Sequence, residues 1–308
     1  MQPDCERRGP ADQAAPLWIR LAPGIFLLLW SAGYSFGKMA LKYAEPMTLL
    51  ALRYGLVLVL LVPFLAVLRP PRPRHAIDWL HLIVVGLLIQ AGYFGLFYAA
   101  LGLGMSAGAG ALILSLQPIM VALLAPFLAG ERVDGKHWIA LALGLAGAAI
   151  VIAARSTIEI TSAVALLSCA GALFCITVGS LYEKRFGMSH HPVMANFIQY
   201  AAAFLAILPA AWLMEDMRIA WTGEFVLSLA YLVIANSLIA VTLMLAMIRR
   251  GAVSRVSMLL FLVPPVAAVF AWLMIAEPMP ALAWLGMALA AVGIAMAGPA
   301  FWRRLDRA

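Results

Sequence analysis

The 308-residue sequence has very few charged side chains. Asp, Glu, Lys and Arg make up 11% of it, whereas 65% of the residues are apolar and the mean hydropathy is +0.99. A soluble domain carries about 25% charged residues, so this chain lacks the polar surface that a water-facing fold needs. The scarcity of charge excludes an ordinary soluble protein and indicates that lipid surrounds most of its surface.

Metal-type cysteine spacing and nucleotide-binding loops are also missing. Cys5, Cys169 and Cys175 have no metal-type spacing and give no disulfide framework. The glycine-rich stretch 102–110 follows no expected strand and precedes no Lys-Ser/Thr pair, so it is not a phosphate-binding loop. Without a Walker sequence, ATP-driven transport would require a partner chain. We expect no cofactor and no metal.

Catalytic constellations are absent as well. The five histidines fall in expected loops or at helix ends, and no Ser-His-Asp or zinc spacing accompanies them. A membrane-embedded acyltransferase or protease would be expected to show such a pattern. We therefore expect that the protein is not an enzyme, with a membrane-embedded enzyme as the disfavoured alternative.

Ten long apolar runs are present instead. A helix needs about 20 mostly apolar residues to cross a bilayer, and the runs are continuous, unlike the alternating segments of a membrane barrel. The first run has no early small-residue cleavage pattern, which favours a membrane helix over a signal peptide. The sequence predicts an all-α integral membrane protein with ten transmembrane helices, at 21–41, 47–68, 79–101, 106–129, 138–154, 161–183, 193–214, 225–248, 256–276 and 281–301.

The net charge of +7 comes from small basic clusters between these runs, which disfavours nucleic-acid binding. Lys and Arg concentrate in cytoplasmic loops of membrane proteins. With both termini in the cytoplasm, sixteen of the 21 basic residues lie inside. The five assigned to the outside are Lys38, Lys42, Arg53, Arg155 and Arg218. We expect this orientation in the cell inner membrane.

An internal repeat relates the two halves at a constant offset of 146 residues. Rare residue types coincide without a gap: Gly33 with Gly179, Lys38 with Lys184, Pro46 with Pro192, Tyr54 with Tyr200, Pro118 with Pro264, Glu131 with Glu277, Trp138 with Trp284 and Gly147 with Gly293. Five spans per unit, an odd number, predict two inverted five-helix repeats, an arrangement recurrent in secondary transporters. The expected segments are a tail at 1–20, repeats at 21–154 and 155–301, and a tail at 302–308.

Several of these residues also form recognisable motifs. They are Trp30-Ser31 with Lys38, Pro46 with Arg53-Tyr54, Pro118 with Glu131, Pro264 with Glu277, and Gly144 and Gly147 echoed by Gly293. From Leu21 to about Trp302 the sequence resembles the drug/metabolite transporter superfamily, specifically its ten-helix EamA-like members. The resemblance implies alternating access by one chain and efflux of amino acids or other metabolites. Some members carry drugs, sugars, vitamins or nucleotide-linked compounds, so these substrates are alternatives.

Polar residues inside the membrane are costly and therefore mark candidate solute contacts. Ser31 and Tyr34 share one helix face with Lys38, and the offset gives Thr177, Ser180 and Lys184. We expect both stripes to face a central cavity. The alternatives are that the hydroxyls bond carbonyls of their own helix and that the lysines reach the membrane interface.

An amide lies near the middle of the third span of each repeat, Gln90 in the first and Asn236 in the second. Amides suit a neutral or zwitterionic solute, or they join helices to each other. Trp30 and Tyr93 would stack on an apolar solute, or anchor at the interface. Gln117 adjoins Pro118, and the symmetric Pro118 and Pro264 are expected in mid-helix as hinges, or as tolerated kinks.

Acidic residues are confined to expected tails, loops and span ends. Four-helix multidrug members of the superfamily have a glutamate in the first helix, and the stretch Phe26–Gly37 has none. This absence disfavours exchange of cationic drugs for protons. The sequence thus predicts a secondary transporter that exports a small metabolite, with the solute and the lipid bilayer as its partners. One chain suffices to enclose the pathway, and a dimer is an open alternative.

Overall fold

The computed structural model describes residues 17–105, 110, 113–128, 135–155, 162–186, 190–249, 259, 262–275 and 280–296. Within these ranges the backbone is helical apart from turns, short connections and one isolated β-bridge. Five of the described helices are long and apolar enough to cross a membrane, judged by length and composition. The all-α membrane fold expected from the composition is confirmed.

Helices of the second half repeat those of the first at the offset of 146 residues. The bounds of α1 (Leu17–Ala40) and α8 (Ala163–Phe186), and of α2 (Pro46–Leu68) and α9 (Pro192–Met214), differ by 146 at both ends. The third helix of each half has three consecutive segments: α3 (Ala76–Val85), η1 (Gly86–Phe94) and α4 (Gly95–Gly102), then α10 (Gly223–Tyr231), η2 (Leu232–Ala240) and α11 (Val241–Arg249). The remaining described helices are α6 (Gln117–Leu128) and α7 (Gly135–Arg155), matched by α13 (Val263–Ile275) and α14 (Ala281–Met296).

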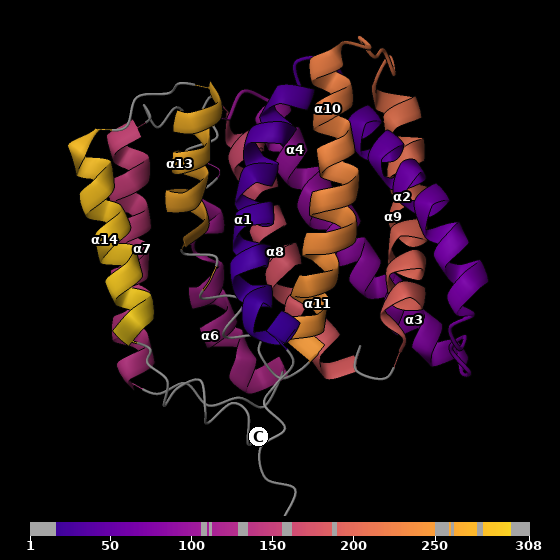
Figure 1. Ribbon diagram of the computed structural model, residues 1–308, viewed down its shortest axis with the longest axis horizontal. Coiled ribbons are helices and arrows are strands. Elements are labelled where there is room, and N and C mark those ends of the chain that lie inside the picture. Colours follow the sequence, from indigo (N-terminus) through magenta and orange to yellow (C-terminus); the bar gives the residue numbers. More distant parts are fainter. Residues whose placement is uncertain are drawn as a thin grey trace, which may run out of the picture.

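The two repeats share one interior. The first helix of each repeat packs against the third of the other, α1 on η2 and α8 on η1, while α2 packs on α9 and α7 on α14. Figure 1 shows α7, α13 and α14 at one end of the molecule, α1 and α8 in its centre, and α2, α3 and α9 at the other end. The central helices therefore present residues of both repeats to the same space.

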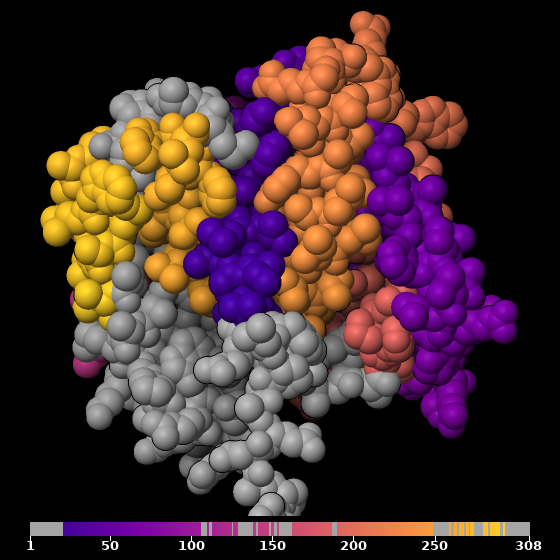
Figure 2. Space-filling view, viewed as in Figure 1, coloured from indigo at the N-terminus to yellow at the C-terminus, as the bar shows by residue number. Residues whose placement is uncertain are grey.

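Large apolar side chains cover the outside of the helices. Examples with more than half of their surface exposed are Val67, Leu167, Leu205 and Leu213. Water-soluble monomers rarely expose so much apolar surface, whereas a bilayer requires it. Figure 2 shows the surface of α10 and α11 lying directly beside that of α1, so the repeats are closely apposed on this face as well.

The connection between α1 and α2 pairs with the one between α9 and α10. Ala44 forms a bridge with Ile219, and the Ala220 amide donates to the Tyr43 carbonyl at 2.9 Å. The Glu215 carboxylate caps the start of α2, accepting from the Met47 and Thr48 amides and from the Thr48 hydroxyl, all at 2.7 Å. An acidic group stabilises a helix N-terminus because the first amide groups have no partner within the helix.

Replacing this cap is expected to destabilise the protein. Glu215→Ala removes three hydrogen bonds to a carboxylate and should cost about 1.5–3 kcal/mol, the range for hydrogen bonds to charged groups. The melting temperature of the purified protein in detergent measures the effect. Asp216→Ala is the matched control, because Asp216 and its partner Arg218 are largely exposed. Equal melting temperatures for the two variants would contradict the role assigned to Glu215.

The two symmetric prolines lie in the first turn of the described helices α6 and α13. Pro118 is the second residue of α6 and Pro264 the second of α13. A turn at Ser115 and Leu116 precedes α6. Proline lacks an N–H group and has a φ suited to the first helical turn, which fits these positions. Their role as hinges remains a prediction.

Candidate functional site

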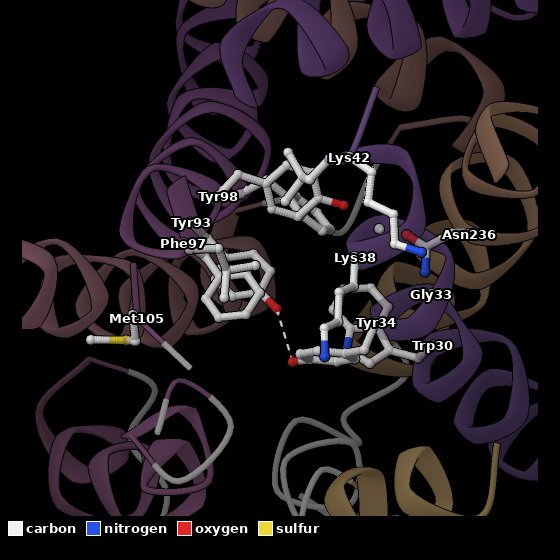
Figure 3. Close-up of a pocket in the computed structure, with 14 residues that line it drawn as sticks. Trp30, Gly33, Tyr34, Lys38, Lys42, Tyr93, Phe97, Tyr98, Met105 and Asn236 are labelled. Carbon is white, nitrogen blue, oxygen red and sulfur yellow. Dashed lines mark hydrogen bonds between the residues drawn. The ribbon is translucent and has the colours of Figure 1, made fainter. Parts of the chain in front are cut away.

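A cavity of about 320 Å³ lies between α1, η1 and α4, and Asn236 of η2 contributes to its wall (Figure 3). Its residues on α1 recur at spacings of three and four, which places them on one face of the helix. The volume falls in the range of small-molecule sites. The described residues that line it are Trp30, Gly33, Tyr34, Gly37, Lys38, Leu41, Lys42, Tyr93, Phe94, Phe97, Tyr98, Leu101, Met105 and Asn236.

Aromatic rings form one end of this cavity. Tyr93 stacks on Trp30 and on Phe97, with ring centroids 6.3 Å apart in both pairs. The hydroxyls of Tyr34 and Tyr93 lie 3.4 Å apart, and Figure 3 shows this hydrogen bond crossing beneath the hollow. Stacked rings held on two helices provide a rigid apolar surface suited to a flat or branched apolar group.

The opposite end, near the C-terminus of α1, carries positive charge. Lys38 and Lys42 line the cavity there, and the Lys42 ammonium lies 3.4 Å from a Glu224 carboxylate oxygen. The Tyr43 hydroxyl donates to the other oxygen of Glu224 at 2.8 Å, and this bond to the carboxylate raises the pKa of Tyr43. A second hollow of about 530 Å³ shares Leu41, Lys42 and Leu101 with the first, so the two hollows adjoin at this end.

Both third helices widen into a π-helix at equivalent positions. Gln90 is the fifth residue of η1 and Asn236 the fifth of η2. A π-helix replaces the regular i+4 backbone hydrogen bonds by i+5 bonds and is common at functional sites. The predicted amide pair therefore sits at the centre of an irregular backbone segment in each repeat.

Two buried tyrosines hydrogen-bond to these π-helices. The Tyr54 hydroxyl donates to the Gln90 carbonyl at 2.7 Å, and the Tyr200 hydroxyl donates to the Ser237 carbonyl at 2.9 Å. Both rings are fully buried, and their centroids lie 5.5 Å apart. Tyr54 and Tyr200 are equivalent in the repeat, so the same side chain stabilises the irregular backbone in both halves.

Arg53 is buried behind the cavity, which corrects its assignment to the outside loops. It lies in α2 with none of its surface exposed. Its Nη2 donates to the Asn236 Oδ1 at 2.7 Å and its Nε to the Ser237 hydroxyl at 2.6 Å. An arginine inside an apolar run is itself a signal of a functional site, and that signal was available in the sequence.

The structure brings together some of the predicted contacts and leaves others apart. Trp30, Tyr34, Tyr93 and Asn236 line the cavity. Ser31 and Gln90 are fully buried, and their side-chain polar atoms have no hydrogen-bond partner among the described residues. The remaining three, Gln117, Thr177 and Ser180, are buried but are not among the described lining residues.

The hydroxyls of the second-repeat stripe bond to their own helix. Thr177 donates to the Leu173 carbonyl and Ser180 to the Ile176 carbonyl, both at 2.7 Å. This geometry matches the alternative considered for the stripe. The cavity residues that sequence reasoning did not single out include Phe94, Phe97 and Tyr98. With Tyr93 they recur at the spacing of one helix face, a pattern that would have indicated them.

No cluster of three or more metal-ligating side chains occurs in the part of the chain that the structure describes. The arrangement offers stacking surfaces, hydrogen-bond donors and positive charge. Groups of these kinds are suited to binding a small solute.

Comparisons with known proteins agree with this architecture. The EamA-like transporter family matches the chain twice, over residues 21–153 and 163–298, which correspond to the two repeats. A solved crystal structure that is 23% identical shares the fold, with a TM-score of 0.75 over 94% of this chain and 98% of the other.

Several relatives carry functional names. The "Probable amino-acid metabolite efflux pump" of Escherichia coli (strain K12) is 26% identical over 280 residues, covering 88% of this chain and 91% of that protein. The "Aromatic amino acid exporter YddG" of Ancylobacter novellus is 30% identical over 156 residues, 48% of this chain and 51% of that protein.

Proposed function

The chain belongs to the EamA-like transporter family, and we propose that it exports small metabolites, amino acids or close relatives of them, by alternating access across the inner membrane. The observation that carries this proposal is the aromatic-lined cavity at the contact between the two repeats. Carriers built from inverted repeats hold their solute at such a contact. The names of the relatives from Escherichia coli and Ancylobacter novellus support the same class of solute.

The solute-contact residues that we propose are Trp30, Tyr34, Tyr93 and Asn236. Stacked rings would hold the apolar part of the solute, and the amide would bind a polar group. No Asp or Glu is among the described lining residues, which disfavours lipophilic cations as the main substrates.

Orientation gives the proposed direction of release. The second hollow adjoins the cavity near Lys42, between the end of α1 and the start of α2, and we propose that the cavity opens there. With the N-terminus in the cytoplasm, as the distribution of basic residues predicts, this end of α1 faces outward. The conformation described would then be the outward-facing one, from which an exporter releases its solute. One chain supplies all the lining residues named, so a monomer suffices.

Counterflow in proteoliposomes tests the proposal. Vesicles that contain the purified protein and are loaded with phenylalanine should accumulate labelled phenylalanine faster than the same vesicles without internal phenylalanine. Trp30→Ala removes one ring of the stack, and we expect KM to rise roughly two- to tenfold, since an aromatic pair contributes about 0.5–1.5 kcal/mol.

Trp212→Ala is the matched control, because Trp212 lies at the end of α9 with 77% of its surface exposed. It should leave KM unchanged. Equal effects of the two substitutions on KM would show that the cavity is not part of the transport pathway. Accumulation of lipophilic cations but of no amino acid or related metabolite would overturn the proposed substrate class.

A further inference from the structure

Arg53 is a buried cation with no carboxylate partner in the part of the chain that is described. Its two hydrogen bonds go to neutral groups, Asn236 and Ser237, and Nη1 has no hydrogen-bond partner there. The guanidinium carbon also lies 4.7 Å from the centroid of Phe94, a ring that lines the cavity. The protein interior around Arg53 has a low dielectric constant and screens charge poorly. The positive charge of Arg53 therefore attracts negatively charged groups in the cavity.

The hydrogen bond from Arg53 fixes the orientation of the Asn236 amide. Arginine is a donor without acceptor atoms, so the amide atom facing it must be the oxygen. The amide nitrogen then lies on the other side, against Gly33. Gly33 and Asn236 both line the cavity, so this wall presents N–H donors to the solute.

The described lining is thus electrically one-sided. Its charged residues are Lys38 and Lys42, of which Lys42 is paired with Glu224 outside the lining, its amide presents a donor, and Arg53 stands directly behind that amide. Donors backed by a cation recognise an anion, and a carboxylate accepts such hydrogen bonds strongly. The ammonium group of a zwitterion meets no carboxylate among these residues.

We infer that the cavity recognises the carboxylate of an organic acid with an apolar or aromatic body. The Asn236 Nδ2 donates to the carboxylate, Arg53 supplies the countercharge behind it, and the rings of Trp30 and Tyr93 hold the body. The amino group of an amino acid is dispensable for binding. This inference rests on the proposed function and narrows its substrate class.

A purely structural role for Arg53 makes a different prediction. If the arginine serves solely to join α2 to η2, replacing Asn236 by aspartate preserves that contact, because the carboxylate occupies the same place and accepts the same hydrogen bond. Under our inference the same substitution neutralises the positive charge and removes the donor, so it weakens carboxylate binding while the helices stay connected.

The experiment measures the binding of four related compounds to the purified protein and their competition in phenylalanine counterflow. The compounds are phenylalanine, 3-phenylpropionate, phenylalanine amide and phenethylamine. For the wild type we expect similar affinities for the two carboxylates and at least roughly tenfold weaker binding of the amide and the amine. In Asn236→Asp the affinity for the two carboxylates should fall at least roughly tenfold, so that the preference for them over the amide and the amine disappears.

Asn196→Asp is the matched control. Asn196 is a buried amide of α9 that donates to the Thr242 hydroxyl at 2.6 Å, and it does not line the cavity. This variant introduces the same chemical change elsewhere in the membrane region and should keep the wild-type ratio between acid and amide.

The outcomes separate the inference from the function on which it rests. Wild-type protein that transports phenylalanine but binds acid and amide equally would overturn the inference alone, whether or not any variant folds. An unchanged ratio in Asn236→Asp would do the same. Failure of the wild type to bind or move any of the four compounds would count against the proposed function itself.

Discussion

Alanine at position 33 is expected to reduce transport at least tenfold while leaving the protein folded. A Cβ atom added to Gly33 would collide with the Asn236 amide nitrogen and lie 3.2 Å from its Cγ. Asn236 has little freedom to retreat, since its Oδ1 accepts from Arg53 at 2.7 Å. Displacing it weakens a hydrogen bond from a buried cation, a loss of about 1.5–3 kcal/mol, which corresponds to tenfold or more in affinity.

Counterflow and melting temperature together measure this effect. Gly24→Ala is the matched control in the same helix, because a Cβ at Gly24 meets nothing within 4 Å. A double substitution separates the collision from other causes. Gly33→Ala should lower the melting temperature of the otherwise wild-type protein. It should not lower that of Asn236→Ala, in which the obstructing amide is gone. Wild-type transport by Gly33→Ala would show that the contact between α1 and η2 tolerates an extra methyl group.

The helix boundaries were predictable where the chain marks them chemically. The second and seventh spans were expected at 47–68 and 193–214, and α2 and α9 run from Pro46 to Leu68 and from Pro192 to Met214. Proline at the first helical position, preceded by Glu45 or His191, gives a local start signal. α1 begins at Leu17, four residues earlier than the predicted start at residue 21. The apolar run begins after the charged Arg20, whereas the helix includes Arg20 in its first turn.

The candidate site was predictable in part. The repeat offset paired Gln90 with Asn236, and both lie at the centre of a π-helix. The π-helices themselves had no sequence signal, since hydrophobic periodicity does not distinguish i+5 from i+4 hydrogen bonding over nine residues. Whether Arg53 reaches outward or inward, and whether Thr177 bonds its own helix, depends on side-chain rotamers that packing decides.

The repeat predicts equivalent polar stripes in the two halves, but the described cavity is asymmetric. The counterparts of Trp30, Tyr34 and Tyr93 at the offset of 146 are Ile176, Ser180 and Ile239, and the counterpart of Arg53 is Gln199. The stacking rings and the buried cation therefore occur in the first repeat alone. The duplicated backbone supplies the framework, and the substituted side chains place the described cavity on one side of it.

Among the proposed glycine-to-alanine substitutions, Gly86→Ala is expected to destabilise the protein most. Gly86 is the first residue of η1, and a Cβ atom there would lie 2.6 Å from the Cα and 2.9 Å from the carbonyl carbon of Gln199. The obstacle is the backbone of α9, which cannot rotate away as a side chain can. Overpacking a close contact costs about 1–3 kcal/mol, and a contact with backbone should fall at the upper end of this range.

This contact joins the two repeats, so its loss should affect more than local packing. η1 belongs to the first repeat and α9 to the second, and Gln199 is the repeat counterpart of Arg53. If η1 and α9 must separate, we expect the melting temperature to fall by roughly 5–10 °C. Gly223→Ala, where a Cβ meets nothing within 4 Å, is the matched control. Equal melting temperatures in the two variants would mean that α9 can move away from η1 at little cost, and the repeats would then be free to shift at this contact during transport.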